Sequence, residues 1–216
     1  MINFPDDTQR LSIIGSTGSG KTQAAQFHLA RRSYDEMPWL IYDFKGDPTI
    51  GSIPYARLIR VDEIPIKPGV YVVQPLPGQV DAVEAQMEAI WERGRMGIYI
   101  DEGYMIGTKN KFFRALLTQG RSKEVPMIVL SQRPVWMDRF VFSESEFFQI
   151  FRLQHKKDVK NVQEFVPANL GERIPEFHSY YYDVKANRVT VLKPVPPIDA
   201  IHDIFYRRLR PIRQVV

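Results

Sequence analysis

Short apolar runs alternate with amphipathic stretches along most of the chain, at the spacing expected of βαβ units. Continuous apolar runs predict buried strands, whereas apolar positions that recur every three or four residues predict helices. The first unit consists of an apolar run at 10–14, a glycine-rich turn and an amphipathic stretch at about 21–32. Strands separated by helices at this spacing predict a mostly parallel sheet with helices on both faces. The pattern therefore indicates an α/β fold.

The remaining elements of the core follow from the same pattern. Amphipathic periodicity predicts helices at 80–93 and 112–118, the first with Val83, Met87 and Ile90 on one face. No internal repeat or low-complexity linker interrupts the series. Further strands are predicted at 39–43, 58–61, 70–74, 98–100, 127–131 and 147–153.

The pattern changes beyond about residue 175. Two segments that read as strands, 178–184 and 188–193, flank Lys185-Ala186-Asn187, which predicts a β-hairpin with a positive φ at Asn187. Prolines then break the chain, and an amphipathic helix is expected at 199–208. We predict that residues 1–175 form the core and that residues 176–216 add the hairpin and a basic helix to the same domain.

Composition narrows the possible chemistry. The 216 residues include no cysteine, which excludes disulfide scaffolds, thiolate metal sites, iron–sulfur clusters and cysteine nucleophiles. The 29 Lys and Arg residues exceed the 25 Asp and Glu residues and give a formal charge of +4, a mild preference for polyanions. No stretch approaches about 18 apolar residues, and the first residues lack a signal-peptide pattern. We therefore expect no transmembrane segment and no secretion.

Residues 15–22 match the Walker A pattern Gly-x4-Gly-Lys-Ser/Thr in full. The match directly follows a predicted strand and opens a predicted helix, the context that this phosphate-binding loop requires. In such a loop the backbone amides and the helix N-terminus bind phosphate, the lysine bridges the β- and γ-phosphates, and the final hydroxyl binds Mg²⁺. Thr22 is thus a predicted metal ligand. The predicted ligands of ATP or GTP are Gly15, Ser16, Thr17, Gly18, Ser19, Gly20, Lys21 and Thr22.

A pair of carboxylates ends the apolar run at 98–100, about 80 residues after Lys21. Asp101 stands where a Walker B aspartate would bind the Mg²⁺ shell. Glu102 points to the opposite side of the strand axis, where it can take a proton from a water that attacks the γ-phosphate. The pair therefore predicts nucleotide hydrolysis, and a solvated strand end is the alternative.

A polar sequence, Ser131-Gln132-Arg133-Pro134, ends the apolar strand at 127–131. Ligands bind at the carboxyl ends of strands in open α/β sheets, so the Gln132 amide is a candidate contact for the γ-phosphate or the attacking water. The Walker A loop, the Asp-Glu strand and this Ser-Gln-Arg-Pro ending together resemble the FtsK/HerA superfamily of hexameric DNA-translocating ATPases. The resemblance covers about residues 10–155, and the turn at 43–47, Asp-Phe-Lys-Gly-Asp, is similar to a turn after the second strand of these proteins.

The compact size of the chain is similar to that of the genome-packaging ATPases of tailless viruses with an internal membrane. This resemblance implies a RecA/ASCE-like P-loop core with ATP and Mg²⁺ as cofactors, and an ATP-driven translocase that moves double-stranded DNA as a ring of about six subunits. It also implies portal or vertex proteins, including membrane-embedded ones, as partners, and the host cytoplasm and the packaging vertex of the virion as the location. Family members supply an arginine finger to the neighbouring subunit from just before the Gln-bearing strand. Here that position implies Arg121 as the catalytic finger, with Arg114 as the second candidate.

Five basic residues and no acidic one lie between positions 109 and 123. A loop after the Asp-Glu strand would bring Lys109, Lys111 and Arg114 to DNA phosphates in the channel of a ring, without reading sequence. A solvated surface loop is the alternative. The arginines at the C-terminal end would suit DNA, an acidic partner or lipid headgroups equally well.

Three other functions remain open at this point. A P-loop nucleoside or nucleotide kinase does not need Glu102 and normally has an arginine-rich lid, for which Arg31-Arg32 would be a weak substitute. A GTP-dependent switch needs an Asn-Lys-x-Asp run, and Lys109-Asn110-Lys111 lacks the aspartate. A filamentous-phage assembly or conjugation ATPase would keep the fold but serve another process.

Overall fold

One mixed sheet organises the chain in the computed structural model, which describes residues 2–107 and 109–213. The nine strands among these residues lie in the order β3-β4-β2-β5-β6-β1-β7-β8-β9. The strands from β1 to β7 pair in parallel, and β8 and β9 are antiparallel. Their bounds are β1 Arg10–Ile14, β2 Pro38–Asp43, β3 Arg57–Ile59, β4 Gly69–Val73, β5 Gly97–Asp101, β6 Met127–Ser131, β7 Phe147–Ile150, β8 Ser179–Asp183 and β9 Arg188–Leu192.

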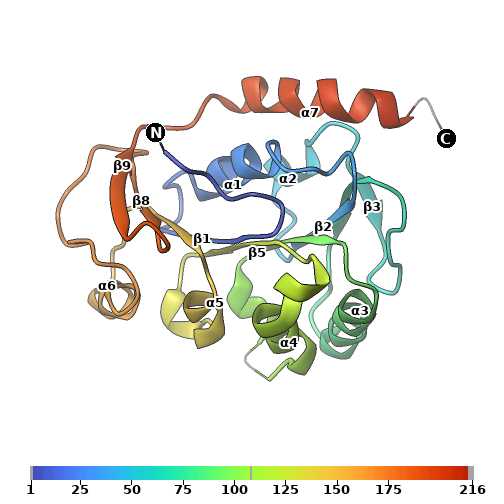
Figure 1. The fold of residues 1–216 in the computed structure, drawn as a ribbon, viewed down its shortest axis with the longest axis horizontal. Helices are drawn as coiled ribbons and strands as arrows, with labels where there is room; N and C mark the ends of the chain where they lie inside the picture. The colour runs from blue at the N-terminus through green and yellow to red at the C-terminus, as the bar shows by residue number, and fades with distance from the viewer. Residues whose placement is uncertain (1, 108, 214–216) are drawn as a thin grey trace.

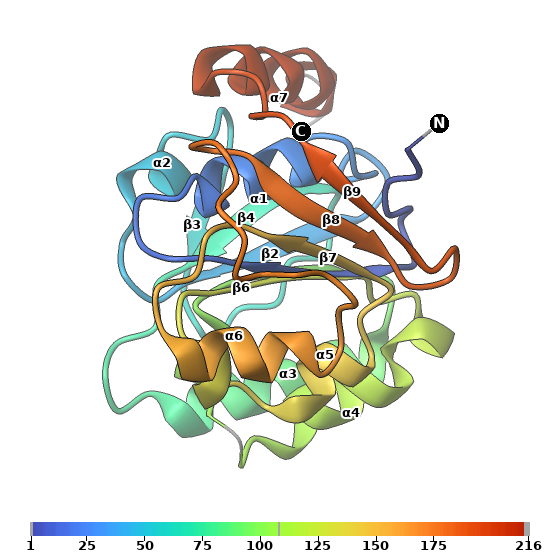
Figure 2. The ribbon, with the colours of Figure 1, turned by 90° about the vertical axis from the view of Figure 1, so that its left-hand side faces the viewer.

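Helices cover both faces of the sheet, which confirms the predicted α/β architecture. In Figure 1, α1, α2 and α7 lie on one side of the strands and α3, α4, α5 and α6 on the other. Figure 2 shows the same two layers from the end of the sheet that carries the hairpin. The bounds are α1 Lys21–Leu29, α2 Pro48–Gly51, α3 Val80–Arg93, α4 Lys111–Gln119, α5 Arg139–Ser143, α6 Lys156–Gln163 and α7 Ile198–Arg213.

The central strands are apolar because both of their faces are covered. Every residue of β1, β2, β4, β5 and β6 is buried. Their side chains alternate between two cores, one under each helical layer. Sheets of this kind lack the apolar–polar alternation of a half-exposed strand, and this is why the sequence showed continuous apolar runs.

The C-terminal segment is integrated into this architecture. β8 pairs with β7 and extends the main sheet, and Asn187 in the following turn has a φ of 47°, as predicted. Helix α7 lies across α1 in Figure 1. Its Ile201, Phe205 and Leu209 are buried in the same core as α1, and the Phe205 ring packs 5.3 Å from that of Tyr34.

Several element ends differ from the sequence prediction. Helix α1 ends at Leu29 rather than near residue 32, β7 ends at Ile150 rather than at 153, and α7 extends to Arg213 rather than to 208. Helices α2, α5 and α6 were not predicted, because two of them span only four and five residues and α6 has only two apolar residues, Val159 and Val162. Among the described residues, no helix combines the length and the apolar character that a membrane crossing requires.

A buried histidine links the sheet to α1. The Nε2 atom of His28 lies 2.7 Å from Oε1 of Gln149 in β7, and Gln149 donates from Nε2 to the Ser179 hydroxyl in β8 at 2.9 Å. Burial lowers the pKa of His28 to about 3, although the hydrogen bond that the imidazole donates to Gln149 opposes this shift. The imidazole is therefore neutral in the folded protein at any pH above about 3.

Acid should destabilise the protein through His28. The unfolded chain takes up a proton near pH 6.5, whereas the folded chain does not, so stability falls as the pH drops below that value. Between about pH 7.5 and about pH 5 this linkage removes roughly 2 kcal/mol. Urea unfolding at both pH values should show a loss that is smaller by this amount in His28→Gln than in the parent protein. Equal losses in the two proteins would contradict the assignment.

Candidate nucleotide site

The predicted site residues meet at one edge of the sheet. β2, β5, β6 and β1 are neighbours and parallel, so their carboxyl ends lie side by side. The phosphate loop follows β1, Asp101 ends β5 and Gln132 follows β6. The structure thus brings together three motifs that lie far apart in the sequence, at the edge where α/β sheets bind ligands.

The amides at the start of the phosphate loop donate hydrogen bonds to β6 and to the segment after β7. The amide of Gly15 donates to the Ser131 carbonyl at 3.2 Å, and that of Ser16 to the Arg152 carbonyl at 3.0 Å. Gly20, which precedes α1, has a φ of 96°, a conformation that favours glycine. The loop therefore needs glycine where its backbone turns into the helix.

Lys21 is held beside the carboxylates. Its Nζ donates to the Ser16 carbonyl at 2.9 Å. Burial lowers the pKa of Lys21, while the negative charges of Glu102 and Asp101 act in the opposite direction. A partly desolvated ammonium group at the loop is well placed to attract the charge of a polyphosphate.

The two carboxylates at the end of β5 are both buried, with exposed fractions of 4% for Asp101 and 2% for Glu102. Burial, followed by the charge of Glu102, raises the pKa of Asp101 to about 7. Glu102 has a φ of 65°, which is uncommon for a residue with a side chain and stores backbone strain. This edge therefore concentrates negative charge that a bound cation would stabilise.

Lys45 is the main site residue to which the sequence analysis assigned no role. Its Nζ forms an ion pair with Oε1 of Glu102. Burial alone would lower the pKa of Lys45, but the hydrogen bond and charge of Glu102 raise it. The turn that carries Lys45 is held by Asp43, whose Oδ1 accepts from the amide of Asp47 at 3.0 Å. The only signal was the similarity of the turn at 43–47, because nothing local shows that β2 lies next to β5.

Gln132 connects the phosphate loop to the carboxylates. Its backbone N–H donates to Oε2 of Glu102 at 3.1 Å, and its side-chain Oε1 accepts from the Thr17 hydroxyl. Glu102 is thus held between Lys45 on one oxygen and Gln132 on the other. The arrangement fixes the carboxylate of the predicted general base.

The donor set suits Mg²⁺ held mainly by its nucleotide. Within the described residues, no three His, Asp or Glu side chains gather into a metal cage. Mg²⁺ typically binds one or two protein oxygens together with phosphates and water. The Thr22 hydroxyl and the Asp101 carboxylate are hard oxygen ligands of this kind. The raised pKa of Asp101 means that the ionised carboxylate is disfavoured in this buried position. A nearby cation would stabilise that ionised form.

A cavity of about 380 Å³ adjoins the phosphate loop. Its walls are residues 16–19 of the loop and residues 173–178 of the segment before β8, together with Phe151, Arg152 and Gln154. Phe177 has a φ of 57°, a strained value for an aromatic residue, and the residue is 47% exposed. A Cβ atom added at Gly20 would lie 3.5 Å from the Phe177 ring. No sequence pattern marked Phe177.

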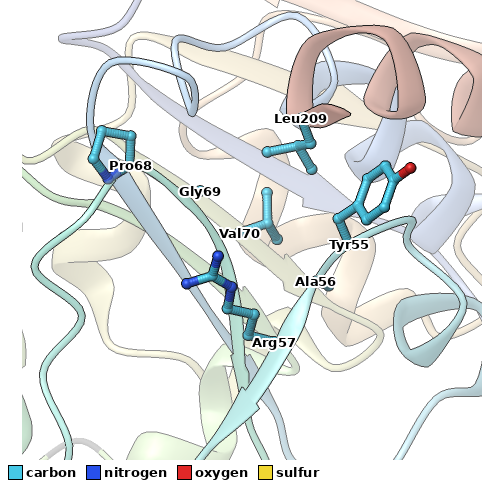
Figure 3. Close-up of a pocket in the computed structure, with 7 residues that line it drawn as sticks. All are labelled: Tyr55, Ala56, Arg57, Pro68, Gly69, Val70 and Leu209. Carbon is cyan, nitrogen blue, oxygen red and sulfur yellow. The ribbon is translucent and has the colours of Figure 1, made fainter. Parts of the chain in front are cut away.

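A second cavity, of about 300 Å³, lies away from these residues (Figure 3). It is formed at the amino ends of β3 and β4, where Leu209 of α7 faces Val70, and it contains none of the predicted site residues. Because the strands are parallel, this cavity is at the sheet edge opposite to the phosphate loop.

The predicted DNA contacts and the predicted finger are divided between the two edges. Lys109 and Lys111 are exposed near the carboxyl edge, before and at the start of α4. Arg114 is bound to the buried Asp138, with 2.5 Å between Nε and Oδ2. Arg121 is exposed in the 3₁₀ turn after α4, at the amino edge, and Lys123 lies 4.2 Å from the centre of the Trp91 ring. A strand of five residues separates the edges by roughly 16 Å, so Arg121 is remote from the phosphate loop of its own chain.

Comparison with known proteins agrees with this geometry. No family model matches the sequence. The DNA packaging ATPase P9 of Enterobacteria phage PRD1 is 45% identical over 213 residues, which cover 93% of each chain. The chain belongs to the family of this phage DNA packaging ATPase.

Solved structures confirm the P-loop ATPase fold. The genome packaging NTPase B204 of Sulfolobus turreted icosahedral virus 2, in complex with AMPPCP, superposes with a TM-score of 0.71 at 15% identity over 88% of this chain and 100% of that chain. ATPases 2 and 3 of EssC from Geobacillus thermodenitrificans give a TM-score of 0.68 at 9% identity over 97% of this chain and 45% of that chain. The predicted relationship to viral packaging ATPases is thus confirmed by the phage relative, and the solved structures confirm the predicted fold.

We expect the adenine base of ATP to lie in the cavity beside Phe177, so replacement of Phe177 should weaken ATP binding. Loss of an aromatic ring that stacks on a base costs roughly 1–3 kcal/mol, so we expect the Kd for ATP to rise at least about fivefold in Phe177→Ala, measured by calorimetry. Affinity for tripolyphosphate, which has no base, should not change, and Phe177→Tyr should bind ATP like the parent protein. An equal loss of affinity for ATP and tripolyphosphate would contradict a base contact.

Proposed function

We propose that this chain is a genome-packaging motor that hydrolyses ATP and moves double-stranded DNA as a ring of identical subunits. One observation carries the proposal: Lys21, Glu102 and Gln132 converge at the carboxyl edge of the sheet in a member of the DNA packaging ATPase family. Portal or vertex proteins would be the partners, and the packaging vertex of the virion in the host cytoplasm the place of action. The ring would have about six subunits.

The phosphates of ATP would lie along the loop from Gly15 to Thr22. Amides of this loop and the N-terminus of α1 favour negative charge there, and the Lys21 ammonium would bridge the β- and γ-phosphates. Thr22 and Asp101 would hold Mg²⁺, which neutralises phosphate charge when bound. The base and ribose would occupy the cavity beside Phe177.

Hydrolysis needs a proton acceptor next to the γ-phosphate, and Glu102 would be that base. Its carboxylate would take a proton from the attacking water, a step worth typically 10²–10⁴ in rate. Lys45 and the backbone N–H of Gln132 hold its two oxygens, so both act as positioning groups. The Thr17 hydroxyl of the phosphate loop donates to the Gln132 side chain. The loop is therefore connected to Glu102 through Gln132. A kinase would have no use for this buried carboxylate, which favours hydrolysis.

Replacement of Glu102, the proposed general base, should stop ATP hydrolysis but leave ATP binding intact. Glu102→Gln keeps the size of the side chain but removes its basicity, so we expect kcat to fall at least about 100-fold while ATP still binds in a fluorescence titration. Glu88→Gln, an exposed site on α3, is the matched control and should hydrolyse ATP normally. Duplex DNA should stimulate hydrolysis by the parent protein. Normal turnover in Glu102→Gln, or no stimulation by DNA, would overturn the proposal.

Arg121 should act on the site of a neighbouring subunit. We expect Arg121→Ala and Glu102→Gln each to be inactive alone and to recover activity when mixed. In an equal mixture about one quarter of the sites combine an intact glutamate with an intact arginine from the next subunit. Hydrolysis after subunit exchange should therefore approach this fraction of the parent rate. A mixture that remains inactive would exclude Arg121 as the finger.

A further inference from the structure

Helix α6 presents a basic face next to the nucleotide site. Arg152, Lys156, Lys157 and Lys160 are exposed within one short segment that leads from β7 through α6. The three lysines share the outer face of the helix, because positions 156, 157 and 160 are neighbours around its axis. In Figures 1 and 2, α6 lies at the periphery of the molecule, below the strands of the hairpin.

The one acidic residue in this segment does not neutralise the lysines. Asp158 is 1% exposed and faces inward. Its carboxylate lies 3.3 Å from Nε of Arg133 and accepts from the amide of Val135 at 3.3 Å. Glu164, just beyond the helix, forms an ion pair with Arg139 at 3.0 Å. Among the ion pairs of the described residues, none involves Lys156, Lys157 or Lys160.

This arrangement is unfavourable for the helix itself. Lys156 and Lys157 lie in the first turn, where the helix dipole disfavours cations. Lys156 and Lys160 are one turn apart, and like charges at that spacing destabilise a helix by a few tenths of a kcal/mol. Within the described residues no ion pair offsets this cost, and the packing of α6 depends on Val159 and Val162 facing inward. A local cost without a compensating ion pair points to a role in binding.

We propose that the outer face of α6, formed by Lys156, Lys157 and Lys160, binds the phosphate backbone of double-stranded DNA. The inference rests on the proposed function, which supplies the polyanion. Unpaired lysines on one helix face suit phosphates without reading bases, as a motor that moves any sequence requires. Among the cations between 109 and 123, in contrast, Arg114 is bound to Asp138 and Lys123 to the Trp91 ring.

The position of α6 also connects DNA contact to nucleotide. The Arg152 carbonyl, four residues before α6, accepts from the amide of Ser16 in the phosphate loop. Arg133, which binds Asp158 of α6, follows Gln132 directly. A shift of the phosphate loop or of Gln132 during hydrolysis would therefore reach the basic face through two contacts.

Charge neutralisation on α6 tests the proposal. The triple variant Lys156→Gln, Lys157→Gln, Lys160→Gln is compared with a matched triple, Lys67→Gln, Lys185→Gln, Lys193→Gln, at lysines that are exposed elsewhere. Binding of a labelled duplex of about 40 base pairs is measured over a range of salt concentrations, for two unrelated sequences. Melting temperatures verify that both variants fold.

The α6 variant should bind both duplexes at least about tenfold more weakly. The slope of log K against log salt concentration is negative, and its magnitude should fall by about 2.7, since each lost phosphate contact removes about 0.9. The matched control should keep the parent affinity and slope. Equal binding by the parent protein and the α6 variant, or the same loss in both triples, would overturn the assignment to α6.

Two further outcomes separate this inference from others. If the parent protein binds no duplex at all, the proposed function fails, and this inference fails with it. If the parent protein binds duplex DNA and the α6 variant binds it equally well, only the role of α6 is refuted. Sedimentation with vesicles of phosphatidylglycerol is run in parallel: loss of vesicle binding with intact DNA binding would assign the face to an anionic membrane and overturn the proposal.

Discussion

Parallel pairing of β1, β6, β5 and β2 is the constraint on which the site depends. The register places Ile14 opposite Ser131 and Asp43 opposite Asp101, so the residues that follow each strand emerge at the same level. A shift of one residue in any pair would turn the side chains to the other face of the sheet. Both faces are buried under helices, and the register is therefore fixed by the cores rather than by the site itself.

The cost of this geometry is negative charge at a buried edge. Asp43, Asp101 and Glu102 are each at most 4% exposed, and burial of an ionised carboxylate is unfavourable unless it is paired. Each of these carboxylates is accommodated in a different way. Asp43 accepts hydrogen bonds from the turn that follows it and from Gln74, and Glu102 forms an ion pair with Lys45. For Asp101, burial raises the pKa to about 7, so its neutral form is favoured. A Mg²⁺ ion bound with ATP would favour the ionised form of Asp101, so binding of the substrate and stability of the site are coupled.

The sequence predicted the parts of the site that are encoded locally. A strand, a glycine loop and a helix follow one another between residues 10 and 29, and the carboxylates directly follow their strand, so each motif could be recognised within a few residues. Lys45 and Phe177 could not be assigned roles in this way, because they reach the site through the pairing of β2 with β5 and through a segment near the other end of the chain. The hairpin was evident from its turn, whereas its attachment to β7 is a non-local contact. Helix α6 was missed since its exposed face is polar and only two apolar residues anchor it.

The distribution of charge over the two sheet edges bears on how copies of the chain would associate. The phosphate loop and the basic face of α6 lie at or near the carboxyl edge, whereas Arg121 lies at the amino edge, remote from the loop of its own chain. An arginine that serves a phosphate site from there must come from another copy that presents its amino edge. Such a contact joins two different surfaces, and head-to-tail contacts of this kind close into rings or continue as filaments. In a closed ring each subunit would then give an arginine to one neighbour and receive one from the other, so every nucleotide site would be shared and hydrolysis in one subunit would act directly on the next.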